Sequence, residues 1–234
     1  MKYLRKFNES ISHDEIHSIC KKYNIANYTI NDDGSINVDG DVDLYNKKLT
    51  KLPLKFRNVT GSFYCNYNQL TSLEGSPTSI GGGFSCNYNQ LTSLEGAPRS
   101  INQDFSCSNN QLKSLEGAPT SVGDNFFCNN NQLSNLEGAP TSVGGHFYCH
   151  NNQLTTLEGA PTSIGRGFYC DSNQLTSLEG SPKSIGYSFN CSNNPISKWW
   201  SKINDKEKLE VFIDLGIDSD SPDWINQEKI DYIT

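Results

Sequence analysis

The sequence predicts a mostly β repeat protein built from 21-residue units, with a helical cap at each end. Three observations predict this class. Seven cysteines recur every 21 residues, each has a phenylalanine two residues before it, and each has an asparagine three residues after it. An internal period of this length is typical of solenoids. The repeated cysteines are Cys65, Cys86, Cys107, Cys128, Cys149, Cys170 and Cys191, and Leu44 takes the same position in a weaker first repeat.

Each position of the repeat has a physical interpretation. Phenylalanine and cysteine two residues apart lie on the same side of a short strand, so both are expected inside the coil. The asparagine carries donors and an acceptor and is expected to satisfy backbone groups where the chain leaves the strand. Two leucines, such as Leu70 and Leu73, fill the next part of the core. A Glu-Gly-Ala/Ser-Pro turn follows, extended because proline lacks an N–H, and Ile or Val closes the coil.

The pattern F-x-C-x-x-N-x-L-x-x-L resembles the leucine-rich repeat, with Phe and Cys at strand positions that aliphatic residues usually occupy. The segment Leu-Glu-Gly-Ala-Pro-x-x-Ile resembles the short bacterial type of this repeat. The resemblance covers about Leu44 to Asn194, and the whole chain looks like leucine-rich-repeat proteins of phage and bacterial genomes. It implies a right-handed solenoid, a concave parallel sheet of about eight short strands, and protein binding rather than catalysis.

The segments outside the repeats are interpreted as caps, which solenoids need at their ends. Residues 1–43 are expected to form a helix, started by a capping box at Ser12–Glu15, and a β-hairpin over residues 28–38. Residues 44–194 form the solenoid. Residues 195–234 form a helical C-terminal cap, with a second capping box at Asn204–Glu207 and a helix start at Ser221-Pro222. The repeats carry no net charge, whereas the two caps carry −3 and −4.

Two repeated columns could suggest metal or redox chemistry, where a column is the set of residues at one position of successive repeats. One cysteine per coil matches neither the close pairs of metal sites nor disulfide geometry, so buried free thiols are expected. The glutamates are expected to accept backbone N–H groups of their own turns, with a Ca²⁺-binding rail as the alternative. These glutamates are Glu74, Glu95, Glu116, Glu137, Glu158 and Glu179.

The functional prediction rests on the outward residues of the strands. Phe127, Tyr148 and Tyr169 are expected on adjacent strands as one exposed aromatic strip, flanked by His146 and His150. These outward columns vary while the core columns hardly change, as expected of a shared scaffold with a specific surface. Aromatic residues supply binding area at low entropic cost. The predicted partner-binding residues are Tyr64, Tyr67, Tyr88, Phe127, His146, Tyr148, His150, Tyr169 and Asp171.

The predicted function is non-enzymatic recognition of a protein partner, such as a host protein modulated by a phage-encoded factor. The alternative is a virion or surface component that binds glycans. His150 is expected to neighbour Asp171 on the next strand, but no nucleophile accompanies them, so no catalytic residue, cofactor or metal is assigned. An acidic total of −7 argues against nucleic acid as the partner. Lacking an apolar run or a secretory signal, the chain is expected to be a cytoplasmic monomer when free.

Overall fold

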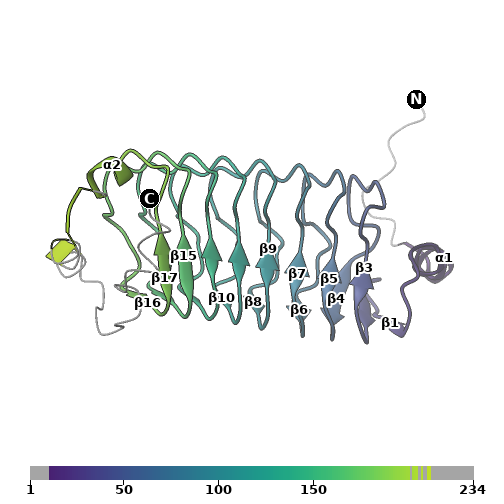
Figure 1. Cartoon of the computed structure of the whole chain (residues 1–234). Coiled ribbons are helices and arrows are strands. Elements are labelled where there is room, and N and C mark those ends of the chain that lie inside the picture. The colour runs from purple at the N-terminus through teal and green to yellow at the C-terminus, as the bar shows by residue number, and fades with distance from the viewer. Residues whose placement is uncertain (1–10, 201, 205–206, 208–209, 212–234) are drawn as a thin grey trace, which may run out of the picture.

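The computed structural model describes residues 11–200, 202–204, 207, 210 and 211, and it shows coils stacked side by side in one row (Figure 1). Each coil advances by 21 residues and hydrogen-bonds to the coils on either side. The described N-terminal part consists of helix α1 (His13–Tyr23) and a hairpin of β1 (Tyr28–Ile30) and β2 (Ile36–Val38). A short helix, α2 (Ser197–Trp200), follows the last coil.

The larger sheet has eight parallel strands in sequential order, as the resemblance implied. Phenylalanine pairs with phenylalanine from coil to coil, and in the first coil Val42 takes its place. This register confirms the alignment of the repeats. The strands are β3 (Val42–Asp43), β5 (Phe63–Tyr64), β7 (Phe84–Ser85), β9 (Phe105–Ser106), β11 (Phe126–Phe127), β13 (Phe147–Tyr148), β15 (Gly167–Tyr169) and β17 (Ser188–Asn190).

A second strand in each coil was not predicted. The Ser-Ile/Val segment, expected only to close the coil, pairs in parallel with its equivalents in two further sheets. One contains β4 (Phe56–Val59) and β6 (Ser79–Ile80) next to the hairpin. The other contains β8 (Ser100–Ile101), β10 (Ser121–Val122), β12 (Ser142–Val143), β14 (Ser163–Ile164) and β16 (Ser184–Ile185). Both strands of a coil therefore bury one apolar residue toward the same narrow interior.

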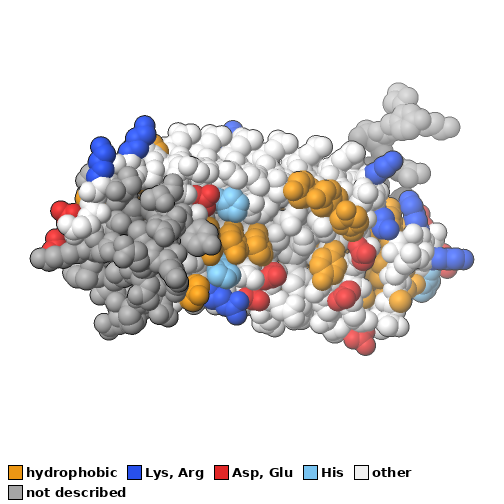
Figure 2. Space-filling model, in the orientation of Figure 1, with side chains coloured by type: hydrophobic (Ala, Val, Ile, Leu, Met, Phe, Trp, Pro, Cys, Tyr) orange, Lys and Arg blue, Asp and Glu red, His pale blue; other side chains and the backbone are white. Residues whose placement is uncertain are grey.

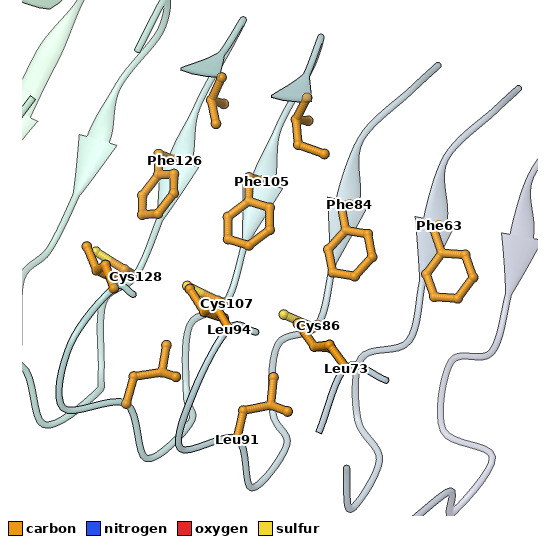
Figure 3. Packing of buried hydrophobic residues seen from close by; sticks show 14 of the residues in the cluster. Phe63, Leu73, Phe84, Cys86, Leu91, Leu94, Phe105, Cys107, Phe126 and Cys128 are labelled. Atoms are coloured by element: carbon orange, nitrogen blue, oxygen red, sulfur yellow. The ribbon is translucent and has the colours of Figure 1, made fainter. Parts of the chain in front are cut away.

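The interior is a set of parallel rows along the solenoid. Figure 3 shows the phenylalanines in one row and the cysteines in another, with the leucines beside them. Phe126 is fully buried and its ring centroid lies 5.2 Å from that of Phe105 and 5.0 Å from that of Phe147. The predicted inward positions are confirmed, and the rings in the middle of the row are each packed between the rings of two neighbouring coils. These are Phe84, Phe105, Phe126, Phe147 and Phe168.

The asparagines satisfy backbone groups, as predicted, and their contacts also join adjacent coils. The Asn131 amide group donates to the carbonyls of Cys107 (3.1 Å), Cys128 (3.1 Å) and Asn129 (3.4 Å). Its oxygen accepts the N–H of Leu112 at 3.1 Å. One buried side chain thus satisfies backbone groups of its own coil and of the preceding coil. The same set of contacts recurs at Asn68, Asn89, Asn110, Asn152, Asn173 and Asn194.

The seven repeat cysteines are free and buried, as predicted, and so is Cys20 in α1. The thiol of Cys107 donates to the carbonyl oxygen of Phe127 at 3.4 Å, and four other cysteines make the equivalent contact. Burial raises the pKa of every thiol in the column, to about 12 for Cys191 and well above the ordinary value for Cys107.

The folded protein should therefore resist thiol reagents. Only the thiolate reacts, and it is scarce at pH 8 when the pKa is so high. We expect Ellman's reagent to detect no rapidly reacting thiol in the native protein and all eight after denaturation in guanidinium. Rapid reaction of the native protein, or fewer than eight thiols after unfolding, would contradict the free, buried assignment.

The predicted role of the glutamate column is wrong. The carboxylates of these glutamates are exposed and accept no N–H of their turns. The contacts at this position are made by the backbone groups of the glutamates. The N–H of Leu115 donates to the carbonyl of Glu137 at 2.9 Å, and the N–H of Glu137 donates to Asn135 Oδ1 at 3.1 Å. The turn is fixed by glycine: Gly138 has φ +85°, and a Cβ there would lie 2.5 Å from the Glu116 nitrogen.

The helix and the hairpin predicted before the repeats are both present. Ser12 and Glu15 form the capping box of α1, and the helix buries Ile16 and Cys20 against the first coils. At the other end, Asn204 and Glu207 exchange the two hydrogen bonds of a capping box, at 2.8 and 3.0 Å. The predicted helix start at Ser221-Pro222 lies outside the described residues. Among the residues described, no helix is long and apolar enough to cross a membrane.

Candidate binding face

The outward side of the eight-stranded sheet carries seven of the nine predicted site residues, and we call it the sheet face (Figure 2). The other two, Tyr67 and Tyr88, lie in the bends that directly follow β5 and β7. Three outward columns cross it: the residues before the inward phenylalanine, between phenylalanine and cysteine, and after cysteine. Alternation along each strand turns these residues outward because their neighbours point into the core. Most of the aromatic residues on this side of the solenoid fall in two separate groups, while Tyr64 stands apart, and Figure 2 shows the exposed hydrophobic side chains as separate orange areas.

The first group is the aromatic strip, formed by Phe127, Tyr148 and Tyr169 on β11, β13 and β15. Adjacent rings are nearly parallel, with centroids 4.9 Å apart for Phe127–Tyr148 and 4.7 Å apart for Tyr148–Tyr169. The predicted strip is therefore present, but its rings are half-buried rather than exposed, because they cover one another's faces. Their edges remain available on the sheet face.

Two histidines border the strip. His146 lies 5.6 Å from Tyr148 and 5.7 Å from Tyr169, ring centroid to ring centroid, and His150 lies 6.1 Å from Tyr148 in an edge arrangement. His150 and Asp171 occupy equivalent positions on neighbouring coils, but no hydrogen bond joins their side chains. The expected neighbourhood of His150 and Asp171 is present without a hydrogen-bonded pair.

His146 also belongs to a chain of side-chain contacts along the first outward column. The backbone N–H of His146 donates to Asn125 Oδ1 at 2.8 Å, and the ring Nδ1 of His146 accepts the backbone N–H of Gly167 at 3.0 Å. The lone pair on Nδ1 is therefore used by the fold, which requires the neutral ring. Burial and the charge of Arg166 lower the pKa of His146, opposed in part by Asp124.

This contact predicts a pH-dependent stability. The folded state holds His146 with a pKa below that of the unfolded chain, so protonation favours unfolding, and stability should fall as the pH decreases from about 7 to about 5. His146→Asn keeps an acceptor, as Asn125 shows one coil earlier, and removes the titration. Urea unfolding at both pH values should show a smaller loss for the variant; equal losses in both proteins would contradict the assignment.

The second group is the tyrosine ladder, formed by Tyr45, Tyr67 and Tyr88. Tyr67 and Tyr88 stack with centroids 4.3 Å apart, Tyr45 lies 5.2 Å from Tyr67, and all three are 44–47% exposed. Tyr67 and Tyr88 have φ of +57° and +51°, in a column otherwise occupied by asparagine or serine. A large side chain is uncommon in this left-handed conformation. Two of the three exposed rings of the ladder, those of Tyr67 and Tyr88, are thus at strained backbone positions.

The structure separates the predicted site residues into groups. His146, His150 and the strip lie together, Tyr67 and Tyr88 form the ladder, and Tyr64 stands apart at 38% exposure. Sequence reasoning missed Tyr45, because the first repeat has leucine in place of the cysteine on which the repeats are aligned. Among the described residues, no group of three or more His, Cys, Asp or Glu could hold a metal ion.

No protein-family model matches the sequence, and a search of curated proteins gives no match.

Proposed function

We propose that the chain is a non-enzymatic recognition module that binds a protein partner on the sheet face. The aromatic strip carries this proposal. Three adjacent strands hold stacked rings in an outward column that elsewhere contains serine, asparagine, aspartate or a single tyrosine, Tyr64. Half-buried, mutually packed aromatic rings are pre-organised, so little side-chain entropy is lost when a partner covers them.

The scaffold supports the same proposal. The core columns repeat almost without change, whereas the outward columns differ from coil to coil. Each coil is tied to its neighbours by the asparagine contacts, so the sheet face is held rigid over the length of the solenoid. We propose further that the chain is a right-handed leucine-rich-repeat protein capped by helices at both ends. In this proposal the chain is a phage-encoded modulator, and its partner is a protein of the bacterial host.

The test is capture of the partner from bacterial lysate with a triple variant, Phe127→Ala/Tyr148→Ala/Tyr169→Ala. The matched control is Ser121→Ala/Ser142→Ala/Ser163→Ala, which changes three coils on the other side of the solenoid. We expect the control to retain a specific partner and the triple variant to lose it, with both proteins folded by circular dichroism. A partner retained by the triple variant, or hits on a glycan array in place of a protein, would overturn the proposal.

A further inference from the structure

A hollow of about 420 Å³ lies on the sheet face between Tyr64 and Phe127. The residues between these two aromatics are small: Ser85 and Ser106 lie in the same column, and Gly83 lies beside Ser85. Tyr64 and Phe127 are three strands apart, or about 14 Å at the usual strand spacing. The hollow therefore exists because two adjacent coils lack the large outward side chains that other coils carry.

One wall of the hollow is the free face of the Phe127 ring. Tyr148 covers the other face of this ring, but on the hollow side the paired residue is Ser106, whose side chain is too small to cover an aromatic face. The uncovered face is thus presented to whatever enters the hollow. The floor offers hydroxyl and amide groups, with Ser106 Oγ donating to Asn87 Oδ1 at 2.6 Å.

A carboxylate also lines the hollow. Asp104 Oδ1 accepts the backbone N–H and the side-chain amide of Asn125, at 3.0 and 2.9 Å. In the described part of the chain no cation pairs with Asp104, so its second oxygen is available to a ligand. Its charge reaches the aromatic strip, where it contributes to raising the pKa of Tyr148.

The three outward columns of the sheet face are acidic, although Arg166 lies at their border, directly before β15. These columns contain Asp41, Asp43, Asp104 and Asp171 and, over the strands β3 to β17, no lysine or arginine. A partner that covers this face must compensate these charges, because an unpaired buried carboxylate is costly. Charge complementarity therefore selects a basic surface.

We propose that the hollow receives an arginine side chain from a basic segment of the protein partner, an inference that rests on the proposed function. A guanidinium group is planar and stacks on an aromatic face such as that of Phe127, and it donates in a fork that fits a carboxylate such as Asp104. Its other N–H groups face the serine hydroxyls of the floor. A neutral sugar could stack on the ring but would leave the aspartates uncompensated.

The probe is N-acetyl-arginine methylamide, compared with its lysine and citrulline counterparts by NMR titration of the full chain. We expect millimolar binding of the arginine compound, with shifts confined to the coils of β5 to β11. Citrulline keeps the shape and loses the charge, so it should bind about tenfold more weakly. The lysine compound should also bind more weakly, because an ammonium group is not planar and cannot stack on the ring or form a bidentate pair with the carboxylate.

Two variants locate the site, and both are checked for folding by circular dichroism, because Ser106→Tyr also removes the hydrogen bond from Ser106 Oγ to Asn87 Oδ1. Asp104→Asn keeps the acceptor for Asn125 and removes the charge, so arginine binding should fall about tenfold, to the level of citrulline. Ser106→Tyr fills the hollow with the residue that later coils carry in this column, and it should abolish binding in a folded protein.

Equal shifts for arginine and citrulline, or arginine binding unchanged in Asp104→Asn, would overturn the proposal. Binding of an oligosaccharide that Ser106→Tyr blocks would also overturn it, in favour of a glycan site. Capture of the lysate partner distinguishes failure of the arginine site from failure of the proposed function. A partner lost with the triple aromatic variant but kept by Asp104→Asn and by Ser106→Tyr would refute the arginine site and leave the proposed function standing.

Discussion

Replacing Phe126 by alanine is expected to lower the free energy of unfolding by about 3–5 kcal/mol, the range for a fully buried phenylalanine. The ring is packed between Phe105 and Phe147, and both of those rings would lose a packing partner. The interior is only one coil wide, so a cavity there lies directly between the two sheets and has few side chains that can move in to fill it. Equilibrium urea unfolding measures the loss.

The neighbouring residue supplies the control. Phe127 belongs to the same two-residue strand but points to the sheet face and is half-buried. Phe127→Ala should cost only about 1 kcal/mol, the value of one aromatic stacking contact, while weakening partner capture. Equal stability losses for the two variants would contradict the inward and outward assignment of β11.

Replacing Asn131 by alanine is expected to cost about 2–4 kcal/mol, because one side chain satisfies several buried backbone groups. The carbonyls of Cys107 and Cys128 and the N–H of Leu112 would lose their contacts with the amide group. Asn131 is only 8% exposed, so solvent can replace few of these contacts. The loss should appear as a lower midpoint of urea unfolding.

A matched control and a charged variant sharpen this result. Gln132→Ala changes an exposed neighbour and should leave stability within about 0.5 kcal/mol of the original. Asn131→Asp keeps the acceptor for Leu112 but places a carboxylate against carbonyl oxygens, so it should be at least as damaging as alanine. A neutral effect of Asn131→Ala would show that the column does not hold the coils together.

The sequence predicts the solenoid well because its period, its inward residues and its asparagine column repeat without interruption. The second strand in each coil escaped prediction because two residues, Ser and Ile or Val, are too few to show an alternating pattern. The glutamate prediction was wrong for a related reason. Conserved spacing within the chain showed that the position matters to the coil, but not that the backbone of the glutamate, rather than its carboxylate, makes the contacts.

The candidate site was predicted in part. Alignment of the repeats brought Phe127, Tyr148 and Tyr169 together, since parallel strands in register place equivalent residues side by side. The hollow was not predicted, because it depends on the small size of Gly83, Ser85 and Ser106 and on the uncovered face that this leaves on the next ring. A search for large side chains overlooks a site made by their absence from one outward column of two coils.

The unbroken 21-residue register also determines how this surface can change during evolution. Duplication or deletion, in frame, of one coil between Tyr64 and the aromatic strip would preserve the core and asparagine contacts between neighbouring coils. It would move the aromatic strip relative to Tyr64 in a step of one strand spacing, about 4.8 Å. Distances between groups on the sheet face therefore change only in whole strand spacings. Recombination within the gene can change these distances, while point substitutions change the side chains that the surface presents.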